Sequence, residues 1–250
     1  MARTLSISLA GLLCLLAASC SRQAEAETDS ILVYCTPDAV PYARMLKRLA
    51  EEGGEQRQIT LAPMRPGDVL AAVEGTRAGD FVVCIGRGLE GKLAKRDLVR
   101  MPPVTHGLGV CLVSAEAMEV ADLGLSGTRL GSGKPGSPLA DAADQAVPQA
   151  LRAAVSANIV HRSARSDQLV RLVKLESLDA AFVWSSPPPA PDLPTLPLPR
   201  QADSRPLRII ALLCSRLPAA DTKAMLDLWQ SPVATQALGE DTGKAEGSAK

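Results

Sequence analysis

The stretch Ala78–Gly88, AGDFVVCIGRG, decides the fold. Its centre, Phe81–Ile85, is an apolar run without polar alternation, and glycines stand on both sides of it. Such a run is typical of a parallel strand buried on both faces of a sheet, because the helices of βαβ units cover both faces. The stretch therefore predicts a central strand that ends in a tight turn and leads into a helix over Gly88–Lys95.

The residues before this strand have the same organisation. Apolar runs predict strands at Ile31–Cys35 and Gln58–Ala62. Each is followed by a helical pattern, over Asp38–Glu52 and Asp68–Val73. Strand, helix, strand, helix, strand at this spacing predicts a right-handed βαβαβ unit. A further strand at Leu108–Ser114 is expected in the same sheet.

A second, smaller α/β unit is predicted after Glu116. Its expected strands and helices are Arg129–Gly131, Leu139–Val147, Asn158–His161, Ser166–Glu176 and Ala180–Trp184. The next segment, Ser185–Pro199, contains seven prolines, which exclude a regular helix or a central strand. We interpret it as a connection back to the first unit, where a strand (Leu207–Ser215) and a helix (Asp221–Leu238) end the fold.

The predicted fold class is α/β, with two lobes that each have a central sheet flanked by helices, joined by two crossovers. The expected domains are lobe I over 31–115 and 200–240, lobe II with the proline-rich crossover over 116–199, and a disordered tail over 241–250.

The first residues predict export. Arg3 precedes an apolar run, Leu5–Leu16, that is too short to span a bilayer. The run ends in Leu16-Ala17-Ala18-Ser19-Cys20, which resembles the end of a bacterial lipoprotein signal peptide. The resemblance implies removal of residues 1–19, a lipid-modified Cys20 that anchors the chain to the inner or outer membrane, and a tether over 20–30. The alternative is an ordinary secretory signal with an incidental cysteine.

Composition argues against several classes of partner. The chain has 27 basic and 27 acidic side chains, which provide no positive field for nucleic acid. Aromatic residues make up only 2% of the chain, which disfavours sites that stack sugars or single-stranded bases on rings.

Five segments carry a resemblance to the type II extracytoplasmic (periplasmic) solute-binding proteins, and within them to the molybdate/tungstate-binding branch. They are Gly79–Val83, Leu98–Ser114, Leu130–Pro135, Ser166–Trp184 and Trp229–Ala234. The resemblance implies a monomer that captures a small oxyanion in an interlobe cleft and delivers it to an ABC-type permease or another envelope protein. It implies neither catalysis nor a cofactor. Lobe closure would use hinges near Val104–Leu108 and Pro197–Leu207.

The resemblance also implies which loops contact the ligand, through hydroxyls and the backbone N–H groups of helix N-termini. The residues at those positions are Thr36, Asp38, Met64, Arg65, Ser137, Ala140, Arg165, Ser166, Trp184 and Ser185. Three of them depart from the family pattern: Asp38 would repel an oxyanion, Arg65 offers a charged fork in place of hydroxyls, and Trp184 replaces a tyrosine.

These departures leave two other functions open. One is an envelope lipoprotein with a degenerate cleft that acts as an interaction or accessory subunit. The other is a thiol or soft-metal protein, with Cys35, Cys84 and Met64 as its ligands. Cys35, Cys84, Cys111 and Cys214 could also form disulfides, or all four could be buried core residues.

Two further patterns allow a functional and a structural interpretation. A cysteine hydrolase would need one of the two histidines, His106 or His161, beside a cysteine, and His161 facing across the cleft offers the one geometric chance. The glycine-rich run Gly131–Ser137, GSGKPGS, fails the spacing of a P-loop. It is either an anion-binding turn before a helix or an ordinary turn.

Overall fold

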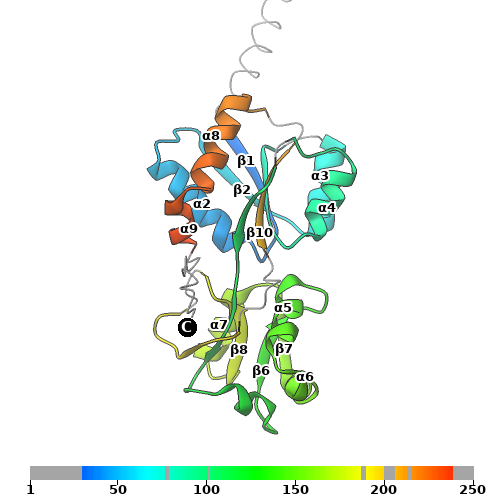
Figure 1. Ribbon diagram of the computed structural model, residues 1–250, viewed down its shortest axis with the longest axis vertical. Helices are drawn as coiled ribbons and strands as arrows, with labels where there is room; N and C mark the ends of the chain where they lie inside the picture. The colour runs from blue at the N-terminus through cyan, green and yellow to red at the C-terminus, as the bar shows by residue number, and fades with distance from the viewer. Residues whose placement is uncertain are drawn as a thin grey trace, which may run out of the picture.

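The computed structural model describes residues 30–76, 79–100, 102–186, 190–199, 206–212 and 216–238. Within them the chain forms two lobes, one above the other, each a five-stranded mixed sheet between helices (Figure 1). This architecture confirms the predicted two-lobed α/β class. The predicted signal peptide, Cys20, its tether up to residue 29, Cys214 and the 241–250 tail lie outside the described residues. In the described part, no helix has the length and apolar character needed to cross a membrane.

Lobe I has the sheet order β2-β1-β3-β10-β4. Its elements are β1 (Ser30–Cys35), α2 (Val40–Glu52), β2 (Gln58–Pro63), α3 (Pro66–Thr76), β3 (Phe81–Ile85), α4 (Gly88–Lys95), β4 (Val104–Gly107), β10 (Pro206–Ala211), α8 (Ala219–Trp229) and α9 (Pro232–Ala237). β1 pairs in parallel with β2 and β3, whereas β10 lies antiparallel between β3 and β4. All five residues of β3 are buried, which confirms the predicted central strand.

Lobe II has the sheet order β7-β6-β8-β5-β9. Its elements are β5 (Val110–Ser114), η1 (Val120–Gly124), β6 (Leu130–Gly133), α5 (Pro138–Ala146), η2 (Gln149–Leu151), α6 (Arg152–Asn158), β7 (Ile159–Ser163), α7 (Ser166–Lys174), β8 (Ala180–Trp184) and β9 (Thr195–Pro197). β9, the strand within the proline-rich segment, is an edge strand, where proline is tolerated because one side of the strand needs no N–H donors.

The prediction that Leu108–Ser114 belongs to the first sheet is wrong. Val104–Gly107 forms β4 in lobe I, and the chain then crosses at Leu108-Gly109 to form β5 in lobe II. β5 is buried throughout, so its apolar run fits the middle of either sheet and the sequence pattern does not distinguish them. As a consequence, Cys111 lies in lobe II and not in lobe I.

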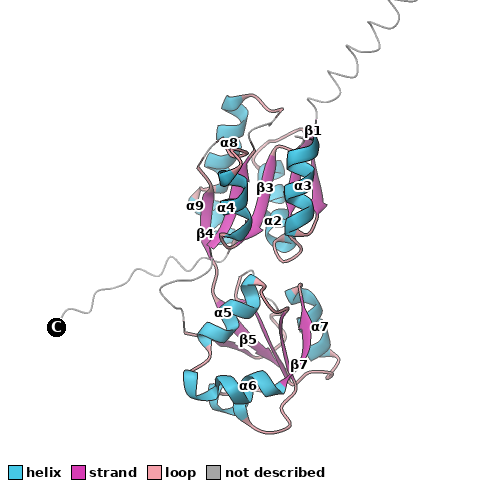
Figure 2. Cartoon of the chain, turned by 90° about the vertical axis from the view of Figure 1, so that its right-hand side faces the viewer, coloured by secondary structure: helices cyan, strands magenta, loops and turns pink. Residues whose placement is uncertain are grey.

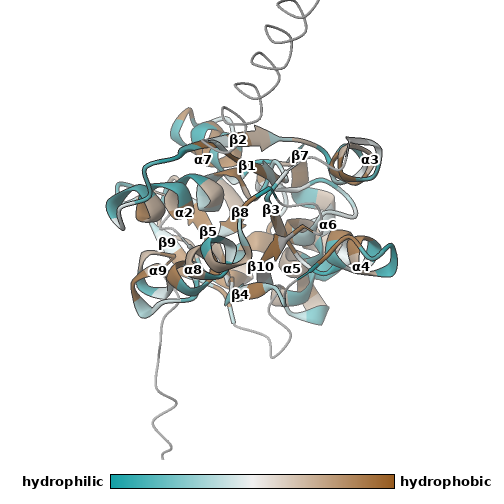
Figure 3. Cartoon of the chain, turned by 90° about the horizontal axis from the view of Figure 1, so that it is seen from above, coloured by the Kyte–Doolittle hydropathy of each residue, from teal (hydrophilic) through white to brown (hydrophobic). Residues whose placement is uncertain are grey.

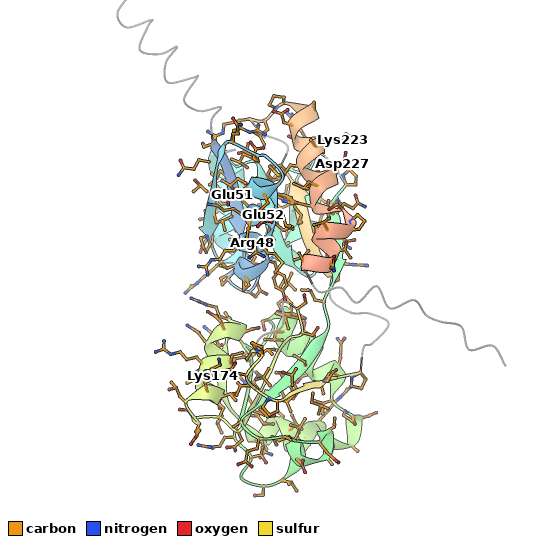
Figure 4. All side chains as sticks on the ribbon, turned by 90° about the vertical axis from the view of Figure 1, so that its left-hand side faces the viewer. Arg48, Glu51, Glu52, Lys174, Lys223 and Asp227 are labelled. Atoms are coloured by element: carbon orange, nitrogen blue, oxygen red, sulfur yellow. The ribbon has the colours of Figure 1, made fainter. Side chains whose placement is uncertain are left out.

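Helices cover both faces of the lobe I sheet. α2, α8 and α9 pack on one face, and α3 and α4 on the other (Figure 1). Strands and inward helix faces are apolar, whereas outer helix faces are hydrophilic (Figure 3). Charged pairs one helical turn apart, such as Arg48–Glu52 on α2 and Lys223–Asp227 on α8, lie on those outer faces (Figure 4). The apolar cluster on the α2 face continues into lobe II, so the lobes are packed together on that side.

Asp80, the residue before β3, ties the strand to its neighbours from a fully buried position. Its carboxylate accepts hydrogen bonds from the backbone N–H of Leu32 (2.8 Å) and of Arg216 (3.0 Å). Its backbone N–H and carbonyl bond to Leu32 and Leu212. The carboxylate therefore connects β1, β3 and the segment that follows β10.

Candidate functional site

Strand directions bring the carboxyl ends of β1, β2 and β3 in lobe I and of β6, β7 and β8 in lobe II toward the region between the lobes. β3 and β4 both run antiparallel to β10, so β4 has the direction of β1, β2 and β3, and it leads straight into lobe II. β8 is antiparallel to β5 and parallel to β6, which is parallel to β7, so these three strands end toward lobe I. Carboxyl ends of strands are where open α/β sheets bind ligands.

We call the loops after these six strand ends the interlobe junction (Figure 2). They comprise residues 36–39, 64–65, 86–87, 134–137, 164–165 and 185–186. The two lobes touch there: a Cβ placed on Gly86 would lie 3.6 Å from Cγ of Pro138, the first residue of α5.

The loop after β1 contributes a hydroxyl and a carboxylate. Thr36 is buried, and its backbone N–H donates to the carbonyl of Val83 in the middle of β3 (3.1 Å). Its carbonyl accepts from the N–H of Ala39 (2.8 Å), which closes a turn before α2. The Thr36 side chain faces the carboxylate of Asp38.

Asp38 lies above the carboxyl ends of β1 and β3, half-buried. Burial raises the pKa of its carboxyl, although the Thr36 hydroxyl and the backbone N–H groups of Asp38 and Ala39 oppose that shift. The carboxylate is close enough to raise the pKa of Tyr42 on α2 and of Cys84 on β3. Tyr42 is also within electrostatic reach of Cys111 on β5, so this corner of lobe I faces lobe II.

The loop after β2 provides fewer groups that could contact a ligand than the family resemblance implies. Met64 donates its backbone N–H to the carbonyl of Cys35 (2.9 Å), and its side chain packs against the apolar cluster under α3 and α4. Arg65 is exposed. Its backbone carbonyl accepts from Val69 in the first turn of α3 (2.9 Å).

The glycine-rich run Gly131–Ser137 completes β6 and turns into α5. Ser137 caps this helix: its Oγ accepts from the N–H of Ala140 (3.2 Å). The Ala140 N–H predicted to contact a ligand is therefore used within the helix cap, whereas the Ser137 hydroxyl hydrogen stays available to donate. Gly133 makes the close approach of strand and helix possible, because a Cβ there would lie 2.5 Å from the Ala140 nitrogen.

Replacement of Gly133 by alanine is expected to lower the free energy of unfolding by about 1–3 kcal/mol, because the added methyl meets backbone that cannot move alone. Chemical denaturation followed by circular dichroism measures the change. Gly91→Ala in α4 is the matched control: its Cβ meets nothing within 4 Å, so helix propensity should stabilise the protein by about 0.5–1 kcal/mol. Equal stabilities of the two variants would contradict the close packing at Gly133.

In the loop after β7, the one basic side chain of the expected site is paired with a neighbouring carboxylate. The Arg165 guanidinium forms an ion pair with Asp167, in which Nε lies 2.9 Å from a carboxylate oxygen, and both side chains are exposed. The Arg165 backbone N–H donates to the Ser163 Oγ (3.0 Å). Ser166, half-buried, is the first residue of α7. Arg165 is thus placed at the junction, but Asp167 neutralises its charge.

The end of β8 holds buried polar groups without partners. Trp184 and Ser186 are each 3% exposed, and the indole Nε1 and the Ser186 Oγ form no hydrogen bond among the described residues. Ser185, between them, is exposed and donates its backbone N–H to Gly109 (3.0 Å). Ser132, one residue before the end of β6, is 1% exposed, and in the described structure its Oγ likewise has no partner.

Ser132 and Ser186 were not among the residues expected from the sequence. Each is one of many serines in the chain, and only the burial of its hydroxyl at a strand end distinguishes it. Unsatisfied buried polar groups cost about 1–3 kcal/mol each, so these groups near the carboxyl ends of β6 and β8 are candidates to bind a ligand or ordered water.

The cysteines do not form the predicted thiol site. Cys35, Cys84 and Cys111 are free and buried. Cys35 is paired in register with Val83, the neighbour of Cys84, so alternation along the strands points the two side chains to opposite faces of the sheet. A disulfide between Cys35 and Cys84 is therefore excluded. No group of three or more His, Cys, Asp or Glu side chains in the described part is placed to hold a metal ion.

Burial raises the thiol pKa to about 11 for Cys35 and about 12 for Cys84 and Cys111. At neutral pH the thiolate fraction of Cys35 is then about one in ten thousand. We expect iodoacetamide to leave all three thiols of the native protein unlabelled and to label them after denaturation, as read by peptide mass spectrometry. If iodoacetamide labels Cys35 or Cys84 in the native protein, the result supports a thiol function.

The histidines are not placed as a hydrolase would need. His106 is buried on β4, and its Nε2 donates to the backbone carbonyl of Trp229 (2.8 Å). His161 lies exposed on β7, the edge strand of lobe II. Neither residue lies in a junction loop.

Two cavities lie away from the junction. One, of about 540 Å³, is in lobe II beside the Arg129–Asp179 ion pair and Glu176. The other, of about 330 Å³, lies in lobe I between the end of α2 and α8, beside Arg57. Both are lined by residues remote from the carboxyl ends of the strands, so they are not extensions of the candidate site.

Comparison with solved structures supports the fold. The substrate-binding domain of a putative molybdenum ABC transporter from Clostridium difficile superposes with a TM-score of 0.66 at 13% identity, over 86% of this chain and 97% of that one. The periplasmic molybdate-binding protein of Azotobacter vinelandii gives 0.63 at 16% identity, over 84% and 97%. The sulfate-binding protein SubI of Mycobacterium tuberculosis gives 0.61 at 13% identity, over 84% and 85%. These likenesses confirm the type II periplasmic-binding-protein fold.

A search of curated protein sequences found no match. The family comparison is decisive, because residues 31–243 match the bacterial extracellular solute-binding proteins. Proteins of this family bind solutes outside the cytoplasm and are not enzymes, as the sequence predicts for this chain. The chain therefore belongs to the family of bacterial extracellular solute-binding proteins.

Proposed function

We propose that this protein captures a small oxyanion at the interlobe junction, as a monomer, and delivers it to an ABC-type permease. The observation that carries the proposal is the set of buried polar groups at Ser132, Trp184 and Ser186, which lack partners among the described residues. The indole N–H is a donor only, and a hydroxyl can donate, so the set is complementary to a ligand rich in acceptors. The structural neighbours that bind molybdate and sulfate are consistent with this ligand class.

The loops supply backbone as well as side chains. α2, α3, α5 and α7 all begin at the junction, and their first N–H groups favour negative charge. No described cluster of metal ligands offers a competing site. Binding is expected to order the two lobes relative to each other, because donors from both lobes must reach one small ligand.

Calorimetry against molybdate, tungstate, sulfate, phosphate and arsenate tests the proposal. The chain has two tryptophans, so Trp229→Phe leaves Trp184 as the sole indole and its fluorescence as a second readout at the junction. We expect at least one oxyanion to bind and change that fluorescence, and Ser186→Ala to weaken binding about tenfold, the effect of one lost hydrogen bond. Absence of heat and of any fluorescence change with all five anions would refute the proposal.

A second function stays open on a specific observation. The Ala140 N–H already donates to the Ser137 Oγ, and the Arg165 guanidinium is already paired with Asp167. In addition, Asp38 places a carboxylate at the junction. Three of the contacts implied by the family resemblance are thus weakened, as expected of a degenerate cleft in an accessory envelope subunit. This function predicts that Asp38→Ser and Arg65→Ala leave all binding signals unchanged.

We also propose that lipid on Cys20 tethers the protein to a membrane. The ground for this is the signal-peptide pattern that ends at Ser19-Cys20. Two or more acyl chains would hold it stably, since each buried methylene contributes about 0.8 kcal/mol. Metabolic labelling with a palmitate analogue tests the tether. Label in the wild-type chain and none in Cys20→Ser supports it, and an unlabelled wild-type chain refutes it.

A further inference from the structure

One charged side chain lies in the otherwise apolar strand β10. The strand reads PLRIIA and is hydrogen-bonded on both sides, to β3 and to β4, so Arg208 stands inside the lobe I sheet. In the register of the sheet it lies opposite Cys84 of β3 and Thr105 of β4. Its side chain is only 14% exposed. Arginine is rarely buried to this extent without a partner, so the hydrogen bonds of its guanidinium decide what it does.

Glu90, in the first turn of α4, is the partner, but it engages only part of the guanidinium. Nη1 of Arg208 donates to Oε1 of Glu90 (3.1 Å). Nε lies 2.8 Å from Oε2, yet it forms no hydrogen bond, because its N–H is not directed at that oxygen. Nη2 likewise has no acceptor among the described residues. The fork of Nε and Nη2, which suits two oxygens of one anion, is therefore open.

The ion pair lies on the lobe I side of the interlobe junction. α4 begins at Gly88, directly after the junction loop 86–87, and Gly86 in that loop approaches Pro138 of lobe II. The thiol of Cys84 is within electrostatic reach of Glu90, Arg208 and the Asp38 carboxylate. The guanidinium is therefore close to the loops after β1 and β3, which belong to the candidate site.

We propose that Arg208 binds the anionic ligand through its open Nε–Nη2 fork, and that Glu90 is a positioning residue that holds the guanidinium beside the junction. This inference rests on the proposed function, because it adds a charged contact to the same site. The groups that carry that proposal, on Ser132, Trp184 and Ser186, are all neutral. Arg208 supplies the positive charge that they lack.

The basic residues expected from the sequence are less suited to this role. Arg65 is exposed, so water screens its charge. The Arg165 guanidinium donates from both Nε and Nη2 to Asp167, so its fork is filled. Arg208 differs from both, since it is largely removed from water and its fork is open. Glu90 limits its strength, because a nearby negative charge offsets the attraction of an anion to Arg208.

Calorimetry with molybdate, tungstate, sulfate, phosphate and arsenate tests the inference, using the anion that the wild-type protein binds most tightly. We expect Arg208→Gln to weaken binding about tenfold or more, the effect of losing a charge-assisted hydrogen bond. We expect Glu90→Gln to tighten binding about threefold or more. Glutamine keeps an acceptor oxygen for Nη1 but carries no charge, so Arg208 stays in place and its charge is no longer offset.

A second ion pair of lobe I provides the matched control. Arg57 is 21% exposed and pairs with Glu55, with Nη2 2.6 Å from Oε2, but it precedes β2 and so lies at the opposite end of the sheet from the junction. Arg57→Gln and Glu55→Gln break a pair of similar burial. We expect both variants to bind the anion with wild-type affinity.

Tighter binding by Glu90→Gln cannot come from a damaged fold, so this variant decides the inference even if Arg208→Gln unfolds. Unchanged or weaker binding by Glu90→Gln would overturn the inference, as would wild-type affinity in a folded Arg208→Gln. In either case binding of an oxyanion by the wild-type protein still upholds the proposed function. If none of the five anions binds the wild-type protein, both proposals are wrong.

Discussion

Replacement of Trp229 by alanine is expected to lower the free energy of unfolding by about 3–5 kcal/mol, the usual cost of removing a buried aromatic side chain. Trp229 is 1% exposed at the end of α8, and its ring packs edge-on against Phe81 of β3, with centroids 4.9 Å apart. Its Nε1 donates to the carbonyl of Leu46 (3.0 Å), so one side chain joins α8, α2 and the central strand. Chemical denaturation followed by circular dichroism measures the loss.

Two variants separate the contributions of ring and hydrogen bond. Trp229→Phe keeps a ring against Phe81 and loses the bond to Leu46, so we expect a loss of about 1–2 kcal/mol. Val233→Ala on the neighbouring α9 is the surface control: Val233 is 61% exposed, and its loss should stay within about 0.5 kcal/mol. If Trp229→Ala unfolds at the same denaturant concentration as this control, Trp229 does not hold lobe I together.

Replacement of Asp80 by alanine is expected to cost about 2–4 kcal/mol, because two backbone N–H groups, of Leu32 and Arg216, lose a charged acceptor. Asp80→Asn retains one acceptor oxygen and is expected to lose about half as much. Thermal denaturation of both variants measures the effect.

The matched control is Asp227→Ala, which removes an exposed carboxylate paired with Lys223 on α8 and should change stability by less than about 0.5 kcal/mol. If Asp80→Ala and this control have the same melting temperature, the hydrogen bonds of the Asp80 carboxylate do not stabilise the fold.

Much of the fold could be predicted from the sequence, because the strands are short apolar runs between clear helix starts and stops. Phe81–Ile85 coincides with β3, and the segment expected to be helical over Asp221–Leu238 forms α8 and α9, the second of which begins at Pro232. The assignment of strands to lobes failed at Leu108, where the chain changes sheets within two residues. A buried strand has the same apolar pattern in either sheet, so only pairing with β8 and β9 places Val110–Ser114.

The candidate site was less predictable than the fold. Family position placed Thr36, Asp38 and Ser185 in loops that the structure brings to the junction, and Trp184 at the end of β8 next to Ser185. It could not indicate that Ala140 and Arg165 are engaged by neighbours in their own loops, because such local hydrogen bonds depend on rotamers. Ser132 and Ser186 lacked any motif, since unsatisfied burial is a property of the folded chain.

The position of β10 in lobe I has a consequence for how the protein is made. All strands of the lobe II sheet come from the continuous segment Val110–Pro197, whereas the lobe I sheet requires β10 to enter between β3 and β4 after that segment has passed. A growing chain can therefore complete lobe II first, but lobe I stays open until Ala211 has emerged. Contacts between such distant segments form slowly. Closure of the lobe I sheet is therefore expected to be slower than closure of the lobe II sheet.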